Sequence, residues 1–479
     1  MHKTRRLRLA REDAQLDAGI AAIQRELQLP QGFSPQVEAV AAKAAAAPRL
    51  PDLDRTELAL VTIDPPGAMD LDQALHVERR GDGYRVHYAI ADVAAFVAPA
   101  DAVDIEANAR GETLYGADRK IPLHPRVLSE DAASLLPDRL RPALLWTIDL
   151  DAHGEGIAVD VVRARVRSRA RLDYAGVQRD IDSGHADPMW GVLRTIGELR
   201  KQREVRRGGV SLSLPEQEIR VDDGRWRLEF RERHAVEDWN EQISLLTGMA
   251  AAHLMVQHGV GLLRTLPDPD PHAIARLRRT AGALDIDWPP ALDYPGFIRS
   301  LDPHRPRNVA MMLASTTVLR GAGYIAFNGQ LPEHSRHSAL AAQYAHATAP
   351  LRRLVDRYTG EICVAVCAKR AVPQWVLGAL PGLPATMQAS GQRAGKYERA
   401  ILDLAEAAAL APHVGETFDA AVIELDRHDP RRGEVMLREP AILGRVSATA
   451  PLPLGERVRV RLVTADPVQR RIEFERVAS

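Results

Sequence analysis

The spacing of hydrophobic residues divides the chain into a helical start, a strand-rich segment, a helix-rich body and a strand-rich end. Residues 12–29 and 34–47 carry apolar residues at helical spacing, and the second run opens with Ser34 followed by Pro35. Serine is a favoured helix cap, and proline is favoured in the first turn. We expect these two helices to form a small N-terminal module over residues 1–50, either a helix–turn–helix or a packing or dimerisation appendage.

From Leu58 onwards the pattern becomes that of strands. LALVTID (58–64) is apolar and β-branched, and ALHVERR and YRVHYAIADV flank a GDG turn at 81–83, which is typical of a hairpin. Helical spacing then dominates, at 187–206, 236–258, 272–284, 308–319, 349–370 and 384–411. Residues 51–412 are therefore expected to form an α+β domain with a mixed sheet and many helices.

The end of the chain changes character again at Gly415. Segments such as GETFDAAVIEL and GERVRVRLVTADP alternate apolar and polar residues and are separated by turn residues. A run of about 65 residues of this kind favours a small closed barrel, for which an OB-type barrel is the simplest candidate. The expected fold class is α+β with a C-terminal OB-type β-barrel over residues 413–479.

The composition of the chain excludes only a few classes of protein. The chain has 479 residues, 46% hydrophobic and 27% charged, as in ordinary globular proteins, and its net charge of −1 means that any nucleic acid must bind to local patches. Its two cysteines are too few for a disulfide scaffold or a structural zinc site. The start lacks the apolar core of a signal peptide, and no run of about 18 apolar residues predicts a membrane span. We therefore expect a cytoplasmic protein.

The stretch TIDPPGAMDLDQA (62–74) crowds three acids into one turn, Asp64, Asp70 and Asp72. Carboxylates at positions i and i+2 of an extended segment point the same way, about 6–7 Å apart. Asp64 arrives from the end of the preceding strand, so we expect the three carboxylates to converge. Clustered oxygen ligands suit Mg²⁺ or Mn²⁺, although an isolated D-x-D is more often a solvated acidic turn.

Several motifs together resemble the RNB catalytic domain of the ribonuclease II/ribonuclease R family. They are TIDPPGAMDLDQAL, YRVHYAIADVAAFV, IPLHPRVLSEDAASLLP, RSRARLDYAGVQ, VEDWNEQISLL and YAHATAPLRRLVDRY, in family order over residues 55–375. The C-terminal barrel matches the family's RNA-binding OB-type domain in place and size. The resemblance implies hydrolytic 3′→5′ degradation of single-stranded RNA to nucleoside 5′-monophosphates with Mg²⁺, or Mn²⁺ in its place.

In the family, four acids of this turn build the metal site, and three carry over as Asp64, Asp70 and Asp72. The fourth position is Gln73, which has a carbonyl oxygen for a metal or its water but no charge. The resemblance implies two ions with RNA bound, with Asp72 and Arg352 acting in catalysis. A weakly active or non-catalytic RNA-binding protein is the alternative, and a metal-dependent phosphodiesterase acting on DNA or small nucleotides is a third.

The resemblance also nominates residues that hold RNA. It places Tyr115 as an aromatic clamp for a terminal base and Arg353 as a lesser companion of Arg352. A second clamping ring is expected near VSLSLPE (210–216), where the sequence has none, so the clamp is one-sided or completed by Leu212. The family's two N-terminal cold-shock domains are replaced here by about 50 helical residues, which is at the lower end of the usual size of a domain.

One basic pattern is evident from the residues alone, without the resemblance to the family. Arg163, Arg165, Arg167 and Arg169 alternate with smaller residues in VRARVRSRARL. On a strand they would share one face, about 6.6 Å apart, which is close to the phosphate repeat of an extended single strand. Either an RNA channel or an acidic neighbouring strand lies opposite such a row.

Overall fold

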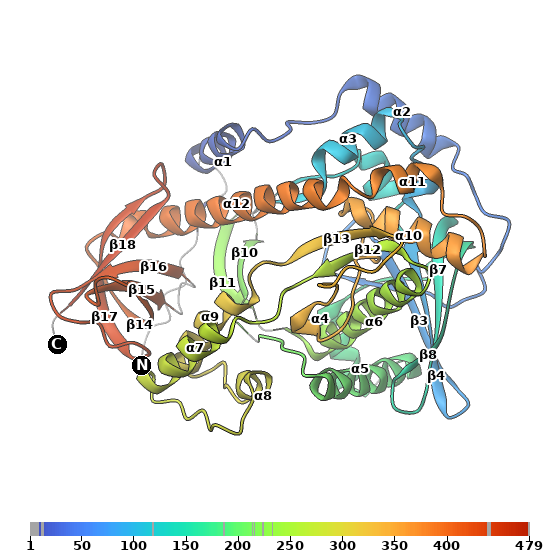
Figure 1. Cartoon of the computed structure of the whole chain (residues 1–479). Helices are drawn as coiled ribbons and strands as arrows, with labels where there is room; N and C mark the ends of the chain where they lie inside the picture. The colour runs from blue at the N-terminus through green and yellow to red at the C-terminus, as the bar shows by residue number, and fades with distance from the viewer. Residues whose placement is uncertain are drawn as a thin grey trace.

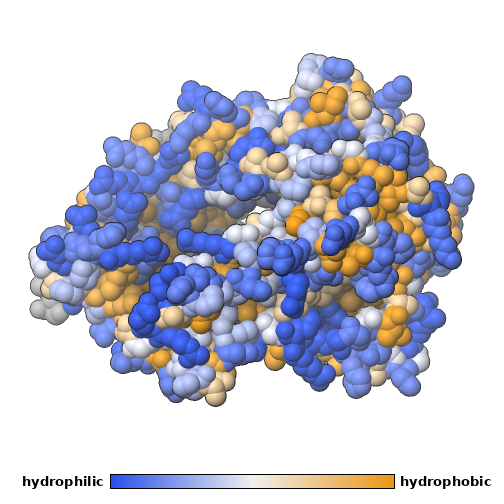
Figure 2. All heavy atoms as spheres, viewed as in Figure 1, coloured by the Kyte–Doolittle hydropathy of each residue, from blue (hydrophilic) through white to orange (hydrophobic). Residues whose placement is uncertain are grey.

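The computed structural model describes residues 9–10, 14–116, 119–184, 187–212, 214, 216–222, 225–231, 233–437 and 442–477. Figure 1 shows an α+β body joined to a small β-barrel by one long helix, α12 (Leu383–Leu410). The predicted fold class is confirmed. Hydrophilic residues cover most of the face in Figure 2, and this face is hollowed below α12, between the barrel and the body.

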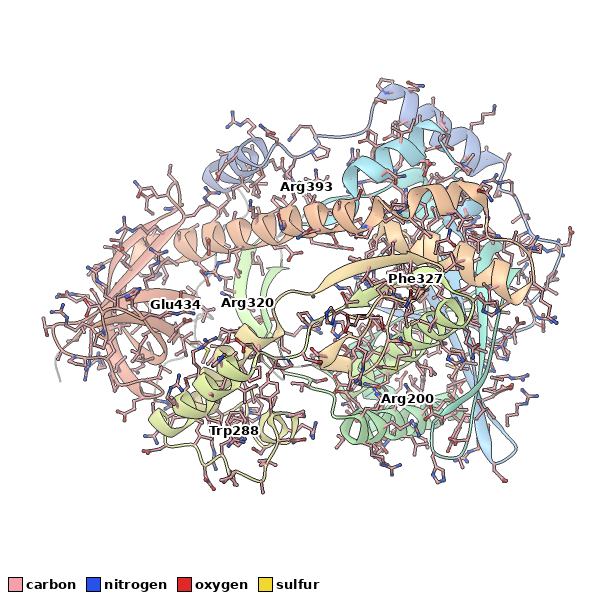
Figure 3. The ribbon with its side chains drawn as sticks, in the orientation of Figure 1. Arg200, Trp288, Arg320, Phe327, Arg393 and Glu434 are labelled. Carbon is pink, nitrogen blue, oxygen red and sulfur yellow. The ribbon has the colours of Figure 1, made fainter. Side chains whose placement is uncertain are left out.

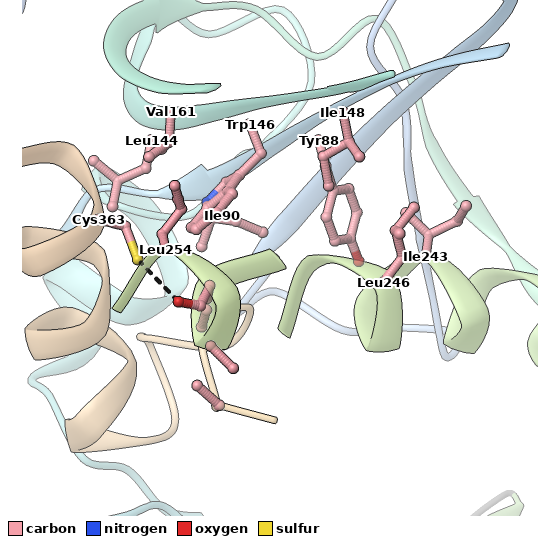
Figure 4. Packing of buried hydrophobic residues seen from close by; sticks show 14 of the residues in the cluster. Tyr88, Ile90, Leu144, Trp146, Ile148, Val161, Ile243, Leu246, Leu254 and Cys363 are labelled. Atoms are coloured by element: carbon pink, nitrogen blue, oxygen red, sulfur yellow. Dashed lines mark hydrogen bonds between the residues drawn. The ribbon is translucent and has the colours of Figure 1, made fainter. Parts of the chain in front are cut away.

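The body is built around an antiparallel sheet in the order β3-β4-β7-β8. Its strands are β3 (Gln73–Arg80), β4 (Gly83–Ala91), β7 (Arg141–Leu150) and β8 (Gly156–Val166). Alternation along the strands sends large side chains to one face, where Tyr88 and Trp146 pack among the helices (Figure 4), and alanines such as Ala89 and Ala143 to the other. Both faces of the sheet are therefore buried.

Helices cover the two faces of the sheet. The face with the large side chains packs against α5 (Pro188–Arg207), α6 (Ala235–Gln257) and α10 (Leu354–Cys367). The alanine face lies under α2 (Pro35–Ala46) and α3 (Ala102–Arg110). The remaining helices are α4 (Tyr174–Asp182), α7 (Pro271–Ala283), α8 (Tyr294–Arg299), α9 (Pro306–Ser315) and α11 (Gln374–Ala379). Cys363 is buried in the core and donates to the carbonyl of Ala251 (3.9 Å; Figure 4).

Short strand pairs complete the body. Strand β2 (Thr62–Asp64) pairs in parallel with β9 (Arg171–Asp173), and β5 (Leu114–Tyr115) pairs with β6 (Lys120–Ile121). Strand β12 (Val260–Thr265) pairs with β13 (Gly323–Asn328), which carries the core residue Phe327 labelled in Figure 3. A separate sheet has the order β1 (Leu9–Ala10), β11 (Arg225–Arg231), β10 (Glu216–Asp222).

The two N-terminal helices lie where the sequence predicted them, but they do not pack on each other as a helix–turn–helix would. Helix α1 (Ala14–Glu26) places Leu16, Ile20 and Ile23 against the C-terminal half of α12 and the barrel. Helix α2 instead inserts Val37 and Ala41 into the core beneath the alanine face. Each helix is thus part of a different core, and Figure 1 shows α1 beside α12 and α2 beside α3.

The predicted C-terminal barrel is confirmed as a closed barrel in the order β14-β15-β16-β18-β17. Its strands are β14 (Thr417–Leu425), β15 (Arg432–Leu437), β16 (Ile442–Ser447), β17 (Arg457–Asp466) and β18 (Arg471–Arg476). In its N-terminal half α12 is fixed to the body by Arg393, labelled in Figure 3, which donates to the carbonyls of Ala109 (3.1 Å) and Arg110 (3.0 Å). Within the described ranges, no helix is long and apolar enough to cross a membrane.

Candidate active site

The acidic turn runs from the end of β2 to the start of β3. Asp64 is the last residue of β2, and Asp70 and Asp72 lie in the loop just before β3. Leu71, between them, is fully buried, and its backbone N–H donates to Ser134 Oγ (2.9 Å). Because Leu71 anchors the loop in the core, the two flanking acids are held at fixed positions at the edge of the sheet.

Asp72 connects this turn to the arginine motif 279 residues later in the chain. Its Oδ1 accepts from the backbone N–H of Leu351 (2.8 Å), and its Oδ2 lies 3.5 Å from Arg352 Nε. Asp72 is only 4% exposed. Burial raises its pKa to about 8, against the lowering effects of Arg352 and of the Leu351 N–H. The structure therefore places Asp72 and Arg352, the two residues nominated for catalysis, next to each other.

Asp64 and Asp70 adjoin this pair. Burial and the charge of Asp70 raise the pKa of Asp64 to about 6, whereas Arg352 opposes that rise. The charge of Asp70 also contributes to the raised pKa of Asp72. Its own carboxylate, however, pairs with Lys120 Nζ at 2.7 Å, and Lys120 reaches Glu130 at 3.1 Å as well. The three acids are neighbours, but each has different immediate partners.

This arrangement differs from the expected metal site. In the part of the chain that the structure describes, no three His, Cys, Asp or Glu side chains lie so that they could hold a metal ion together. The physical reason lies in the partners, since Lys120 binds Asp70 and the Leu351 N–H binds Asp72. As they lie, the residues do not fit a site in which three carboxylates share two ions.

Gln73, the tentative fourth ligand, is engaged at both ends by protein groups. Its Nε2 donates to the carbonyl of Thr348 (2.6 Å), and its Oε1 accepts from Tyr88 Oη (3.0 Å). Tyr88 Oη also lies 2.9 Å from Ser244 Oγ on α6, so the serine donates when the tyrosine gives its proton to Gln73. Figure 4 shows Tyr88 pointing from the sheet towards α6. Gln73 therefore ties β3 to the arginine loop, and its tentative role as a metal ligand stays a prediction.

The two adjacent arginines have different surroundings. Arg352 has a side chain that is 44% exposed next to Asp72. Arg353 forms two hydrogen bonds to Asp356 (2.9 Å each), and this carboxylate raises the pKa of Arg353 against the effect of burial. Asp356 also accepts from the backbone N–H of Ala349 (2.7 Å). The guanidinium of Arg353 is therefore committed to the loop, and its expected contact with RNA stays a prediction.

Tyr115 remains available as the predicted clamp. Its side chain is 39% exposed, and the pKa of its hydroxyl is raised by burial and affected by Arg352, Asp70 and Asp72. It therefore lies beside the acidic turn. Leu212, considered as the opposite wall of the clamp, packs against the hydrophobic cluster of α7, α8 and α9.

The row of alternating arginines does not form a free cationic wall. Strand β8 ends at Val166, so only Arg163 and Arg165 lie on it. Arg163 pairs with Asp92 (2.8 Å) and Glu361, and Arg165 pairs with Asp54 (3.3 Å). Of the remaining pair, Arg169 donates to the carbonyl of Glu57 (2.8 Å), and Arg167 is exposed. The alternative of acidic neighbours applies to the two arginines on the strand.

Sequence reasoning missed Lys120, Glu130, Tyr88 and Asp356. Asp356 follows Arg353 by three residues, a spacing that allows an ion pair and could have been noticed. Lys120 stands opposite Tyr115 in the β5–β6 pair, but no local pattern indicates that its ammonium reaches Asp70.

Comparison with known proteins agrees with the fold. The RNB domain model matches residues 53–368, and the model of the RNase II-type exonuclease C-terminal S1 domain matches residues 416–477. The chain belongs to the RNB family. It is 29% identical over 332 residues to exosome complex exonuclease RRP44 homolog A of Arabidopsis thaliana and 29% identical over 349 residues to ribonuclease R of Escherichia coli. These matches cover 65% and 68% of this chain but only 35% and 42% of the relatives.

Solved structures show the same fold. Mycoplasma genitalium RNase R in complex with ribose methylated single-stranded RNA superposes with a TM-score of 0.86 at 20% identity, over 97% of this chain and 78% of that one. Yeast Ssd1, described as a pseudonuclease, has a TM-score of 0.71 at 16% identity, over 91% of this chain and 56% of that one. The fold is thus shared by a ribonuclease and by a protein described as lacking nuclease activity.

Proposed function

We propose that this protein is a hydrolytic 3′→5′ exoribonuclease that shortens single-stranded RNA to nucleoside 5′-monophosphates and depends on Mg²⁺, or on Mn²⁺ in its place. The observation that carries the proposal is the meeting of Asp72 and Arg352, which are 280 residues apart in the chain, beside the exposed ring of Tyr115. Membership of the RNB family supports the same reaction.

The chemistry assigned to each residue follows from its surroundings. Phosphodiester hydrolysis concentrates negative charge on the phosphoryl oxygens, and a fixed cation nearby stabilises that charge. Arg352 is such a cation, because its side chain is 44% exposed and is positioned by Asp72. Tyr115 offers a ring on which any base can stack, an interaction worth about 1–3 kcal/mol per base.

A second candidate is an RNA-binding protein with little or no catalysis. The observation that favours it is the occupation of the acidic turn by the chain's own groups, Lys120 on Asp70 and the Leu351 N–H on Asp72, together with Gln73 at the fourth position. The likeness of the fold to Ssd1, described as a pseudonuclease, is compatible with it.

One assay separates these functions. Oligo(A) RNA with a 5′ label and a DNA of matched sequence are incubated with Mg²⁺ and, separately, with EDTA. We expect products shortened from the 3′ end on RNA alone, lost in EDTA and in Asp72→Asn, and unchanged in Asp238→Asn, whose carboxylate pairs with Lys201 away from the acidic turn. RNA binding without cleavage under any metal supports the second candidate. Equal cleavage of DNA contradicts both and supports a phosphodiesterase of broader substrate range.

A further inference from the structure

Arg264, near the end of β12, is a half-buried cation beside the arginine loop. Its backbone N–H donates to the carbonyl of Tyr344 (2.8 Å), in the segment that leads to Arg352. Its guanidinium carbon lies 4.7 Å from the centre of the ring of Tyr324. Within the described part of the chain, no carboxylate forms an ion pair with Arg264, and no oxygen accepts a hydrogen bond from its side chain. Stacking on one tyrosine is thus the contact that the chain provides for this charge.

A guanidinium in such surroundings needs an anion. Taking a charge out of water is costly, and a cation–π contact returns only about 0.5–2 kcal/mol. The neighbouring Arg353 meets this need within the chain, through two hydrogen bonds to Asp356 (2.9 Å each). Burial raises the pKa of Glu112 against the charge of Arg264, yet Glu112 Oε1 is buried and has no hydrogen-bond partner in the described structure. The N–H donors of Arg264 are therefore left for a group from outside the chain.

Tyr324 holds the guanidinium in place. It is the direct cross-strand partner of Arg264 in the β12–β13 pair, so both side chains project from the same face of this two-stranded ribbon. Its hydroxyl lies 2.7 Å from Nδ1 of His346, whose ring meets those of Tyr324 and Tyr344 edge-on, with centroids 5.6 and 5.5 Å apart. His346 lies six residues before Arg352. Tyr324 thus ties the orientation of Arg264 to the loop that carries Arg352.

The ribbon of β12 and β13 connects the arginine loop with the hollowed side of the molecule. Figure 1 shows β13 beneath α12, running from the side of the barrel towards α10, which follows the arginine loop. Thr265 and Gly323 pair at the barrel end of the ribbon, one position beyond Arg264. Arg320, labelled in Figure 3, is exposed and precedes β13 by three residues at this same end. The hollow below α12 in Figure 2 therefore adjoins the end of the ribbon that carries Arg264.

We propose that Arg264 binds a phosphate of the RNA backbone, on the 5′ side of the nucleotide at Arg352, and that Tyr324 positions it for this contact. The proposal deepens the proposed function and rests on it for the identity of the ligand. An internucleotide phosphate supplies the anion that the chain does not, and the planar guanidinium can donate two parallel hydrogen bonds to its oxygens. Because phosphate contacts carry no sequence information, this contact is independent of the base.

The test measures binding rather than cleavage. Short 5′-labelled oligo(A) RNAs, each with one uncharged methylphosphonate linkage at a different position from the 3′ end, are titrated with the full chain in EDTA, and fluorescence anisotropy gives the Kd. Each is compared with an RNA that carries the same 2′-O-methyl group but a normal phosphate. We expect one linkage at which loss of the charge weakens binding by wild type about tenfold, and at which this penalty disappears in Arg264→Met while the penalties at other linkages remain. Arg264→Lys, which keeps the charge, should retain part of it.

Matched variants separate this contact from a general effect on the fold. Arg79→Met is the control, because Arg79 and Tyr84 form a similar cross-strand stack (5.5 Å) at the turn of the β3–β4 hairpin, and it should keep the wild-type pattern. Tyr324→Leu should reduce the penalty at the Arg264-dependent linkage, whereas Tyr324→Phe, which keeps the ring, should preserve it. If circular dichroism shows that Arg264→Met does not fold, Arg264→Gln replaces it in the same scan.

An unchanged pattern in Arg264→Met, or an equal loss of affinity at every linkage, would overturn the proposal. Failure of the proposed function is a separate result. An Arg264-dependent linkage without any cleavage in Mg²⁺ contradicts exoribonuclease activity and leaves the phosphate contact standing, whereas shortening from the 3′ end without such a linkage does the reverse. Wild-type protein that does not bind RNA contradicts both.

Discussion

At the scale of single residues, two adjacent arginines have different roles, because Arg353 holds the fold together and Arg352 is available for chemistry. Arg353 is bound at two points by a fully buried Asp356, whereas Arg352 is 44% exposed beside Asp72. A buried charge that loses its partner is costly, while a half-exposed pair contributes little to stability. The same chemical change should therefore have opposite consequences at the two positions.

We expect Arg353→Met to lower the free energy of unfolding by about 3–5 kcal/mol, because it leaves Asp356 buried and unpaired. Arg352→Met should change stability by less than about 1 kcal/mol but slow RNA cleavage about a hundredfold, the effect typical of losing one group that stabilises developing charge. Urea unfolding and single-turnover cleavage measure the two effects. Equal losses of stability in both variants would contradict the division of roles.

Gln73 leads to a second prediction at this scale. In Gln73→Glu the carboxylate cannot donate to the carbonyl of Thr348, so we expect a loss of about 1–3 kcal/mol in the free energy of unfolding and no gain in Mn²⁺ affinity. If Gln73 were instead a weakened metal ligand, the added charge would tighten Mn²⁺ binding. Titration calorimetry beside thermal unfolding decides between these outcomes.

At the scale of elements, the loop before α10 shows what could be predicted and what could not. The helical pattern over 349–370 correctly indicated a helix, yet α10 begins only at Leu354. The backbone N–H groups of Ala349 and Leu351 donate to Asp356 and Asp72, and these bonds hold the preceding turn out of the helix. Contacts between residues hundreds of positions apart leave no local pattern.

The same limit applies to the site. The motif positions of Asp64, Asp72, Tyr115 and Arg352 follow from the sequence, because each lies in a run of recognisable residues. The ion pair of Lys120 with Asp70 depends on how β5 and β6 pack against the acidic turn. No property of the lysine or its neighbours in the chain encodes it.

The junction between α12, β10 and the barrel should be sensitive to pH. Glu406 on α12 is 2% exposed and accepts from Gln217 Nε2 (2.6 Å) and from the backbone N–H of Leu443 (3.1 Å), both through Oε1. Burial raises the pKa of Glu406 from 4.5 to about 7, against the lowering effect of these two hydrogen bonds. The folded state therefore favours the protonated form.

The direction of the pH effect on stability follows from the difference in the pKa of Glu406 between the folded and unfolded states. Below pH 4.5 both states are protonated and the contribution of Glu406 to stability is complete; it is lost as the pH rises to about 7, at about 1.4 kcal/mol per pH unit. Glu406→Gln keeps both acceptor bonds without the charge. We expect this variant to match wild type in thermal unfolding at pH 4.5 and to exceed it at pH 8. Parallel curves at all pH values would contradict the raised pKa.

At the scale of the whole molecule, α1, α12 and the barrel share one hydrophobic core. Ile23 of α1 is 1% exposed in that core, and Leu404 of α12 is equally buried. The N-terminal helix therefore braces the long helix that connects the barrel to the body. Changes in α1 should therefore alter the stability of the barrel. Because α1 and β14 begin about 400 residues apart in the chain, packing and not chain proximity couples them.

We expect Ile23→Ala to lower the free energy of unfolding by about 2–5 kcal/mol, the range for truncating a buried isoleucine. Hydrogen exchange should increase in α12 and in the barrel strands together, because they lose the same support. Ile105→Ala is the matched control, since Ile105 is 63% exposed on α3. Increased exchange confined to α1 would show that this helix is only an appendage.

The bond from Asp72 to the backbone of Leu351 also bears on how the protein is made. A ribosome releases the acidic turn first and the arginine loop only after a further 279 residues. Until then the nascent chain cannot bring Arg352 beside Asp72, so under the proposed function we expect a polypeptide stalled or broken before this point not to cleave the messenger RNA still being translated. Under the proposed function, the long separation of the two segments thus delays RNA cleavage until about three quarters of the chain has been synthesised.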